Sequence, residues 1–210
     1  MTNLLQQFSN DLAELGESVL RSLVQVRNGR RGAGAGTIWH ADGLIMTNAH
    51  VVDGIRQGRA GGQEPLTVLL PDGRELPARV LARDPVYDLA ALRVDAQDLP
   101  TIALGDSRQL QPGQIVLCLG FPWGVTGGAT SGVVIDVGAA LPEVRDPKHE
   151  WIAASLHLRP GHSGGPMVDT QGRLVGINTM MNGPDVGVAV PVHVAKAFLQ
   201  QMMAQAYTRV

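Results

Sequence analysis

The sequence is organised around RPGHSGGP, residues 159–166, which place a single serine among glycines with a proline near each edge. Glycine adopts backbone conformations that a Cβ atom forbids, so such a turn can present a serine hydroxyl and backbone N–H groups toward one point. An acyl-transfer nucleophile needs those groups. A glycine- and proline-rich surface loop has the same composition, so this stretch alone does not decide between the two interpretations.

Length, charge and cysteine content limit the possible classes. The 210 residues, 44% of them hydrophobic, suffice for one large or two small domains with a real core. The formal net charge of -2 gives no electrostatic reason to expect nucleic acid or an anionic membrane as a partner. Cys118 is the single cysteine and lies in an apolar run, so we interpret it as a core residue and expect no disulfide, zinc or iron–sulfur site.

The N-terminal segment does not resemble an export signal. Asp11, Glu14 and Glu17 interrupt its apolar residues, and the first basic residue is Arg21. No apolar run is long enough to cross a bilayer. We therefore expect a cytoplasmic location for the chain as it stands, and a periplasmic or extracellular one if an export signal has been removed.

Hydrophobic spacing predicts a helix at each end and strands between them. Apolar residues recur at intervals of three and four from residue 3 to about 21 and again from 192 to about 205. The intervening apolar segments are short and are separated by turn signals such as ADG at 41–43 and QG at 171–172. This pattern favours antiparallel barrels or sandwiches, and the polar stretch 97–113 is typical of a linker.

A reactive serine needs a base, and the base needs a group that orients it. Of six histidines, His50 stands out because the pattern predicts that it ends an apolar strand, in MTNAHVV at 46–52. Asp88 directly precedes the apolar segment 89–92, where a carboxylate needs a partner such as an imidazole N–H. The chain order His50, Asp88, Ser163 is that of chymotrypsin.

Three segments around these residues carry a specific resemblance. TNAHVV (47–52), DLAAL (88–92) and GHSGGP (161–166) resemble the catalytic motifs of chymotrypsin-fold serine proteases, specifically of the HtrA/Deg family. The similarity runs from about residue 22 to 203 and includes LGDS (104–107), GFP (120–122), TSGVV (130–134), GINT (176–179) and GVAVP (187–191).

The resemblance implies an all-β fold of two six-stranded antiparallel barrels of the chymotrypsin/trypsin type, with an N-terminal and a C-terminal helix. The expected boundaries are 1–21 for the N-terminal amphipathic helix, 22–100 for the first barrel, 101–113 for the linker, 114–191 for the second barrel and 192–210 for the C-terminal helix and tail.

The resemblance also implies a serine endopeptidase that cleaves unfolded or damaged proteins through a covalent acyl-enzyme. Ser163 would be the nucleophile, His50 the general base and then acid, and Asp88 the group that orients His50. The backbone N–H groups of Gly161 and Ser163, with His162, would form the oxyanion hole. These roles require no metal or cofactor. The implied partners are unfolded or misfolded proteins and peptides, with a homotrimer as the family's usual assembly.

Cleavage preference should depend on the residues before Ser163 and on the segment 177–180. The expected lining of the primary specificity pocket is His157, Ile177, Asn178, Thr179 and Met180. The position six residues before the serine holds His157 and no acid, so we do not expect cleavage after Arg or Lys.

Departures from the family pattern keep other interpretations open. His162 replaces the usual asparagine, and ASLH at 154–157 replaces the usual Thr-Asp-Ala segment. A catalytically silent or switchable chaperone-like binding module on the same fold is therefore the alternative, and an esterase or other acyl transferase is a third possibility. HtrA proteins usually carry PDZ domains, and this chain ends at Val210, about where the first would begin.

Overall fold

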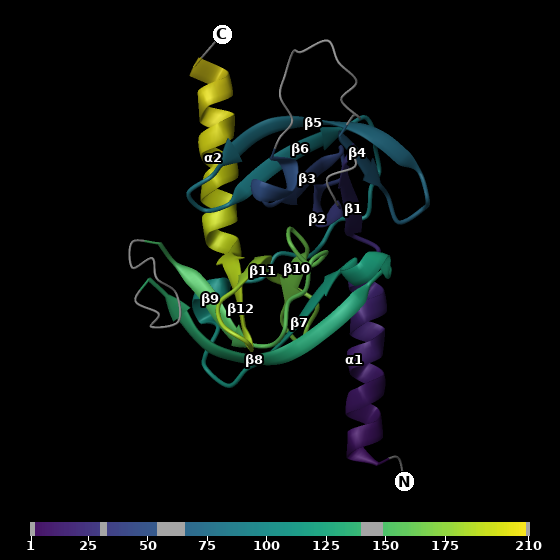
Figure 1. Cartoon of the computed structure of the whole chain (residues 1–210), viewed down its shortest axis with the longest axis vertical. Coiled ribbons are helices and arrows are strands. Elements are labelled where there is room, and N and C mark those ends of the chain that lie inside the picture. Colours follow the sequence, from purple (N-terminus) through teal and green to yellow (C-terminus); the bar gives the residue numbers. More distant parts are fainter. Residues whose placement is uncertain (1–2, 30–32, 54–65, 140–148, 209–210) are drawn as a thin grey trace.

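The structure is a computed structural model that describes residues 3–29, 33–53, 66–139 and 149–208. It consists of two closed six-stranded antiparallel barrels with a helix at each end of the chain (Figure 1). The fold class predicted from the sequence is confirmed. The outermost residues of the predicted terminal segments, 1–2 and 209–210, lie outside the described residues.

Helix α1 spans Leu4–Leu20 and begins at an N-cap, Asn3, whose side chain accepts the N–H of Leu5. It runs away from the second barrel, with the N-terminus at the far end (Figure 1). Its last turns pack on the body of the protein, where Val19 is buried, whereas Leu4 and Leu5 are exposed. Only the C-terminal part of the predicted amphipathic face is therefore covered in this chain.

The first barrel closes in the order β1-β2-β3-β6-β5-β4. Its interior is filled by aliphatic side chains that alternate along the strands, including the fully buried Val24, Ile38 and Leu92. The strands are β1 (Leu23–Asn28), β2 (Ala33–His40), β3 (Leu44–Thr47), β4 (Leu66–Leu69), β5 (Glu75–Asp84) and β6 (Leu89–Val94).

The second barrel closes in the order β10-β11-β12-β9-β8-β7 and encloses its own apolar cluster. The segment that joins the barrels contains a short 3₁₀ turn, η3 (Ser107–Gln109), and attaches to the second barrel through a bridge between Leu104 and Leu174. The strands are β7 (Ile115–Gly120), β8 (Gly128–Gly138), β9 (Trp151–Ser155), β10 (Pro166–Val168), β11 (Leu174–Met181) and β12 (Val186–Pro191).

Helix α2 (Val192–Thr208) leaves the second barrel and runs alongside the first (Figure 1). Its buried residues Val194, Phe198 and Leu199 join an apolar cluster that contains side chains of both barrels. This cluster packs the two barrels against each other and so fixes the position of the cleft between them. No helix in the described part of the chain is long and apolar enough to cross a membrane.

Candidate active site

Strand pairing in the first barrel brings His50 and Asp88 together. Strands β3 and β6 are antiparallel neighbours, with Thr47 opposite Ala90. Asp88 immediately precedes β6, as predicted from the sequence, with its backbone in the left-handed region at φ 54°. His50 begins the 3₁₀ turn η2 (His50–Val52) rather than ending β3. From this turn the imidazole of His50 reaches the carboxylate of Asp88.

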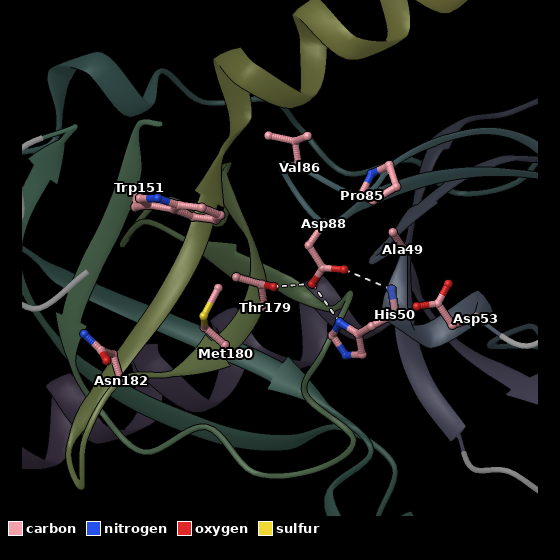
Figure 2. Close-up of a pocket in the computed structure, with 10 residues that line it drawn as sticks. All are labelled: Ala49, His50, Asp53, Pro85, Val86, Asp88, Trp151, Thr179, Met180 and Asn182. Atoms are coloured by element: carbon pink, nitrogen blue, oxygen red, sulfur yellow. Dashed lines mark hydrogen bonds and ion pairs between the residues drawn. The ribbon is translucent and has the colours of Figure 1, made fainter. Parts of the chain in front are cut away.

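The carboxylate of Asp88 is the centre of a hydrogen-bond network that crosses the cleft (Figure 2). Its Oδ2 lies 2.7 Å from Nδ1 of His50, and its Oδ1 accepts the backbone N–H of His50 at 2.9 Å. Thr179, on β11 of the second barrel, donates its hydroxyl to Oδ2. The backbone carbonyl of Asp88 accepts from Ala49 N and Asn48 Nδ2, which fixes the left-handed backbone.

These contacts decide the charge of Asp88. Burial opposes its ionisation, since the side chain is only 19% exposed, but the hydrogen bonds from His50 and Thr179 outweigh burial and lower the pKa of the carboxyl. An ionised carboxylate can only accept, so Nδ1 of His50 carries the proton and Nε2 is left as an acceptor. The imidazole is 47% exposed, so Nε2 can reach a proton donor in the cleft.

The loop that carries Ser163 is docked against the first barrel. The carbonyl of Ser163 accepts the N–H of Ala35 on β2 at 2.8 Å, and Gly164 N donates to Asn178 O at 2.8 Å. A Cβ atom at Gly164, where φ is +83°, would lie 2.2 Å from both Ala35 O and Thr47 Oγ1. The glycine is needed for this approach, which places Ser163 beside the segment that leads from Thr47 to His50.

Thr179 connects the two halves of the site. Its side chain binds Asp88, while its carbonyl accepts the hydroxyl of Ser163 at 3.3 Å. Among the described residues, no hydrogen bond joins Ser163 to His50. The hydroxyl of Ser163 is therefore held by one long hydrogen bond in this conformation. The sequence predicted Thr179 as a pocket residue, and its contact with Asp88 was missed because it links segments 91 residues apart.

Two backbone N–H groups beside Ser163 are free to bind an oxyanion. Across the described residues, neither Gly161 N–H nor Ser163 N–H takes part in a backbone hydrogen bond. The structure differs from the sequence prediction at His162, because its N–H donates to Arg159 O at 2.9 Å and is not free. The candidate oxyanion hole is therefore formed by Gly161 and Ser163.

An open cavity of about 740 Å³ lies next to His50. Figure 2 shows side chains of both barrels around it. Its lining consists of Ala49, His50, Asp53, Pro85, Val86, Asp88, Trp151, Thr179, Met180 and Asn182. Sequence reasoning missed Pro85, Val86 and Trp151, because apolar residues in loops and at strand ends give no signal that distinguishes them from core residues.

Of the five predicted pocket residues, Thr179 and Met180 line this cavity. Ile177 and Asn178 are fully buried in β11, where Asn178 donates to Pro166 O. His157 is exposed, and its Nδ1 lies 2.9 Å from Pro184 O. The structure therefore does not bring all five residues to the surface of this cavity.

Both the sequence and the fold of this chain are similar to those of known serine proteases. The family model described as trypsin-like peptidase domain matches residues 34–177. A DegP-like periplasmic serine endoprotease of Halomonas elongata is 39% identical over 178 residues, 82% of this chain and 35% of that protein. A protein of the same name from Marinomonas sp. is 38% identical over 178 residues, 82% of this chain and 36% of that protein. The solved HtrA-type protease AlgW with a tripeptide has a TM-score of 0.79 at 28% identity and covers 90% of this chain and 62% of that one.

The chain therefore belongs to the trypsin-like peptidase domain family. Within it, the relatives are serine proteases of the HtrA/Deg type, which confirms the family predicted from the three sequence motifs. The chain spans about a third of the length of these curated relatives, at 35% and 36%.

Proposed function

We propose that this chain is a serine endopeptidase that cleaves unfolded or damaged proteins, with Ser163 as nucleophile, His50 as general base and Asp88 as the residue that orients it. The observation that carries the proposal is the 2.7 Å contact between the Asp88 carboxylate and Nδ1 of His50, with Ser163 docked beside the segment that leads to His50. The family assignment supports it.

The first half of the proposed reaction transfers the acyl group to the enzyme. Rotation of the Ser163 side chain breaks its single hydrogen bond to Thr179 O and turns Oγ toward Nε2 of His50. His50 takes the hydroxyl proton as Oγ attacks the peptide carbonyl carbon, and Asp88 stabilises the imidazolium. General base catalysis of this kind contributes roughly 10²–10⁴ in rate. The oxyanion accepts hydrogen bonds from the N–H groups of Gly161 and Ser163, and each such donor is worth about 10²–10³.

The second half releases the products. The imidazolium of His50 gives its proton to the leaving amine nitrogen as the C–N bond breaks, which leaves an ester on Ser163. A water molecule then attacks the ester carbonyl while His50 takes one of its protons. Breakdown of the second tetrahedral intermediate returns a proton to Ser163 Oγ and releases the carboxylic acid. Apart from the substrate and this water molecule, the steps use only side chains and N–H groups of the chain.

The open, largely apolar cavity supports a polypeptide substrate that is already unfolded. Val86 and Met180 at its rim are 58% and 42% exposed, so they can contact the apolar side chains that an unfolded chain displays. The relatives from Halomonas elongata and Marinomonas sp. are named as periplasmic serine endoproteases. We extend that compartment to this chain as part of the proposal, and a homotrimer remains a prediction from the family.

The hydrogen bond from Ser163 to Thr179 O favours a second candidate, a switchable binding module whose serine is disengaged at rest. Incubation with a reduced, carboxymethylated protein separates the two. The endopeptidase proposal expects fragments with the wild type and none with S163A. Wild-type protein that suppresses aggregation of a client without cutting it would support the binding module, and turnover of esters without peptides would indicate an esterase.

A further inference from the structure

The residue between the two oxyanion-hole positions is a buried histidine. His162 is 1% exposed, and its imidazole points away from the cleft toward the start of its own loop. Its Nδ1 accepts the backbone N–H of Arg159 at 3.1 Å, while its backbone N–H donates to the carbonyl of Arg159 at 2.9 Å. Both main-chain polar groups of Arg159 are therefore bound by His162.

The turn that His162 closes contains Gly161. The carbonyl of Gly161 accepts Phe121 N at 2.9 Å, and its φ of +106° is a conformation that favours glycine. Gly165 N donates to His162 O at 2.9 Å and closes a second turn directly after the first. With its carbonyl fixed, the direction of the Gly161 N–H depends on the peptide group before it, and hence on how Arg159 and Pro160 are held.

The other end of Arg159 is held as well. Its guanidinium lies 5.0 Å from the ring centroid of Trp123, whose indole is 79% exposed. A cation over an exposed indole is a weak contact in water, so it restricts the side chain more than it fixes the backbone. The backbone of the turn is thus fixed mainly from within, by His162.

We propose that His162 is a positioning residue, whose imidazole closes the turn from Arg159 to His162 and so aims the N–H of Gly161 at the developing oxyanion. The proposal rests on the proposed function and adds a residue that acts through Gly161 rather than on the substrate. It also assigns a role to the histidine that stands where the family usually has asparagine.

Nδ1 of His162 lies 3.1 Å from the backbone N of Arg159 and 3.2 Å from its carbonyl O, so the ring accepts that N–H only when its proton is on Nε2, and with the proton on Nδ1 it would donate to the carbonyl instead. The positioning role belongs to the neutral imidazole with its proton on Nε2. Burial lowers the pKa of His162 and outweighs the hydrogen bonds to the backbone of Arg159 and Gly128, which raise it; the nearby charges of Arg159 and His157 lower it further. The neutral form is thus the stable one at neutral pH. Protonation in acid would turn Nδ1 from an acceptor into a donor toward the carbonyl of Arg159, so the N–H of Arg159 would lose its partner.

Two substitutions test the proposal at the site itself. H162L removes the acceptor and keeps an apolar side chain, whereas H162N retains an acceptor that does not titrate. Leaving the partly buried N–H of Arg159 without a partner corresponds to a loss of roughly 5- to 150-fold in kcat. We expect that loss in H162L with KM nearly unchanged, and recovery of most of it in H162N. Equal kcat in H162L and the wild type, or folded H162N no better than H162L, would overturn the proposal.

The pH profile supplies a readout that a merely structural role would not move. In the wild type, kcat/KM should fall in acid as His162 is protonated and Nδ1 ceases to accept the N–H of Arg159. In H162N this part of the acid loss should be absent, while H40N, a substitution of an exposed histidine in the first barrel, should keep the wild-type profile. Superimposable profiles for the wild type and H162N contradict the proposal.

A measurement without substrate keeps this proposal separate from the proposed function. Nitrogen-15 NMR of the wild type at pH 7 should show His162 neutral with its proton on Nε2, and the Gly161 amide resonance should move further in H162L than in H162N. A wild type that neither cleaves nor labels at Ser163, yet shows these signals, refutes the proposed function alone. A proton on Nδ1 of His162, or an unmoved Gly161 amide, refutes the positioning role.

Discussion

Thr179 offers the sharpest test of how the two barrels cooperate. Thr179 is only 4% exposed, and its hydroxyl donates to Asp88 across the cleft. Replacement by valine, T179V, keeps the shape of the side chain and the carbonyl that accepts Ser163 Oγ, and removes only this donor. The variant therefore isolates one hydrogen bond to the carboxylate.

The size of the effect follows from the charge of the acceptor. A hydrogen bond to an ionised group contributes about 1.5–3 kcal/mol, and for a domain of this length each kcal/mol is about 2–4 °C in Tm. We expect T179V to lower Tm by about 3–12 °C at pH 7. The pKa of Asp88 is lowered in the fold, so this stability is present above its unfolded value and is lost as pH falls through the folded value. The gap between the variant and the wild type should therefore narrow below about pH 4.

Thermal unfolding at pH 7 and in acid measures both the drop in Tm and its dependence on pH. T37V is the matched control, because Thr37 in β2 is fully buried and its hydroxyl has no hydrogen-bond partner among the described residues. The same substitution there should be neutral or stabilising. If T179V were as stable as the wild type, or if its deficit did not change with pH, the account of the Asp88 network would be refuted.

Other substitutions test the remaining parts of the site and its scaffold. G164A should abolish activity and lower the free energy of unfolding by more than about 3 kcal/mol, because its Cβ would lie 2.2 Å from two oxygen atoms of the first barrel. G73A, at φ +88° in open space, should lower the free energy of unfolding by only about 1–2 kcal/mol. D88N should lower kcat by about 10⁴ in a peptide assay, since an amide there favours the wrong tautomer of the base; an unchanged kcat would exclude Asp88 from catalysis. F198A, in the cluster shared by both barrels, should lower the free energy of unfolding measured in urea by about 3–5 kcal/mol. The exposed F8A should lower it by less than about 1 kcal/mol.

Much of the fold could be predicted from the sequence because the signals are local. Periods of three to four residues mark α1 and α2, and short apolar segments between turn residues mark the strands. Asp88 lies before one apolar strand and His50 beside another, which also pointed to their pairing. Because β3 and β6 are antiparallel neighbours, Nδ1 of His50 lies 2.7 Å from Oδ2 of Asp88. Regular hydrophobic periods, and a carboxylate placed directly before an apolar strand, can be recognised from the sequence alone.

The details of the site could not be predicted because they depend on contacts between distant segments. Nothing near Thr179 in the sequence indicates that its hydroxyl binds Asp88. The hydroxyl of Ser163 points to the backbone carbonyl of Thr179, and the glycines around Ser163 do not indicate that direction. His162 could have faced the cleft or the interior, and only the turn around Arg159 decides. Side-chain direction in a tight loop has no sequence period to reveal it.

The most direct test of the central claim is covalent labelling of Ser163 with a fluorophosphonate, followed by intact-mass analysis of the wild type, S163A and D88N. The proposed mechanism predicts one adduct on the wild type, none on S163A and a much slower adduct on D88N. Labelling of S163A at the wild-type rate would contradict it. An unlabelled wild type, even with an unfolded protein added, would contradict it as well and favour the binding module.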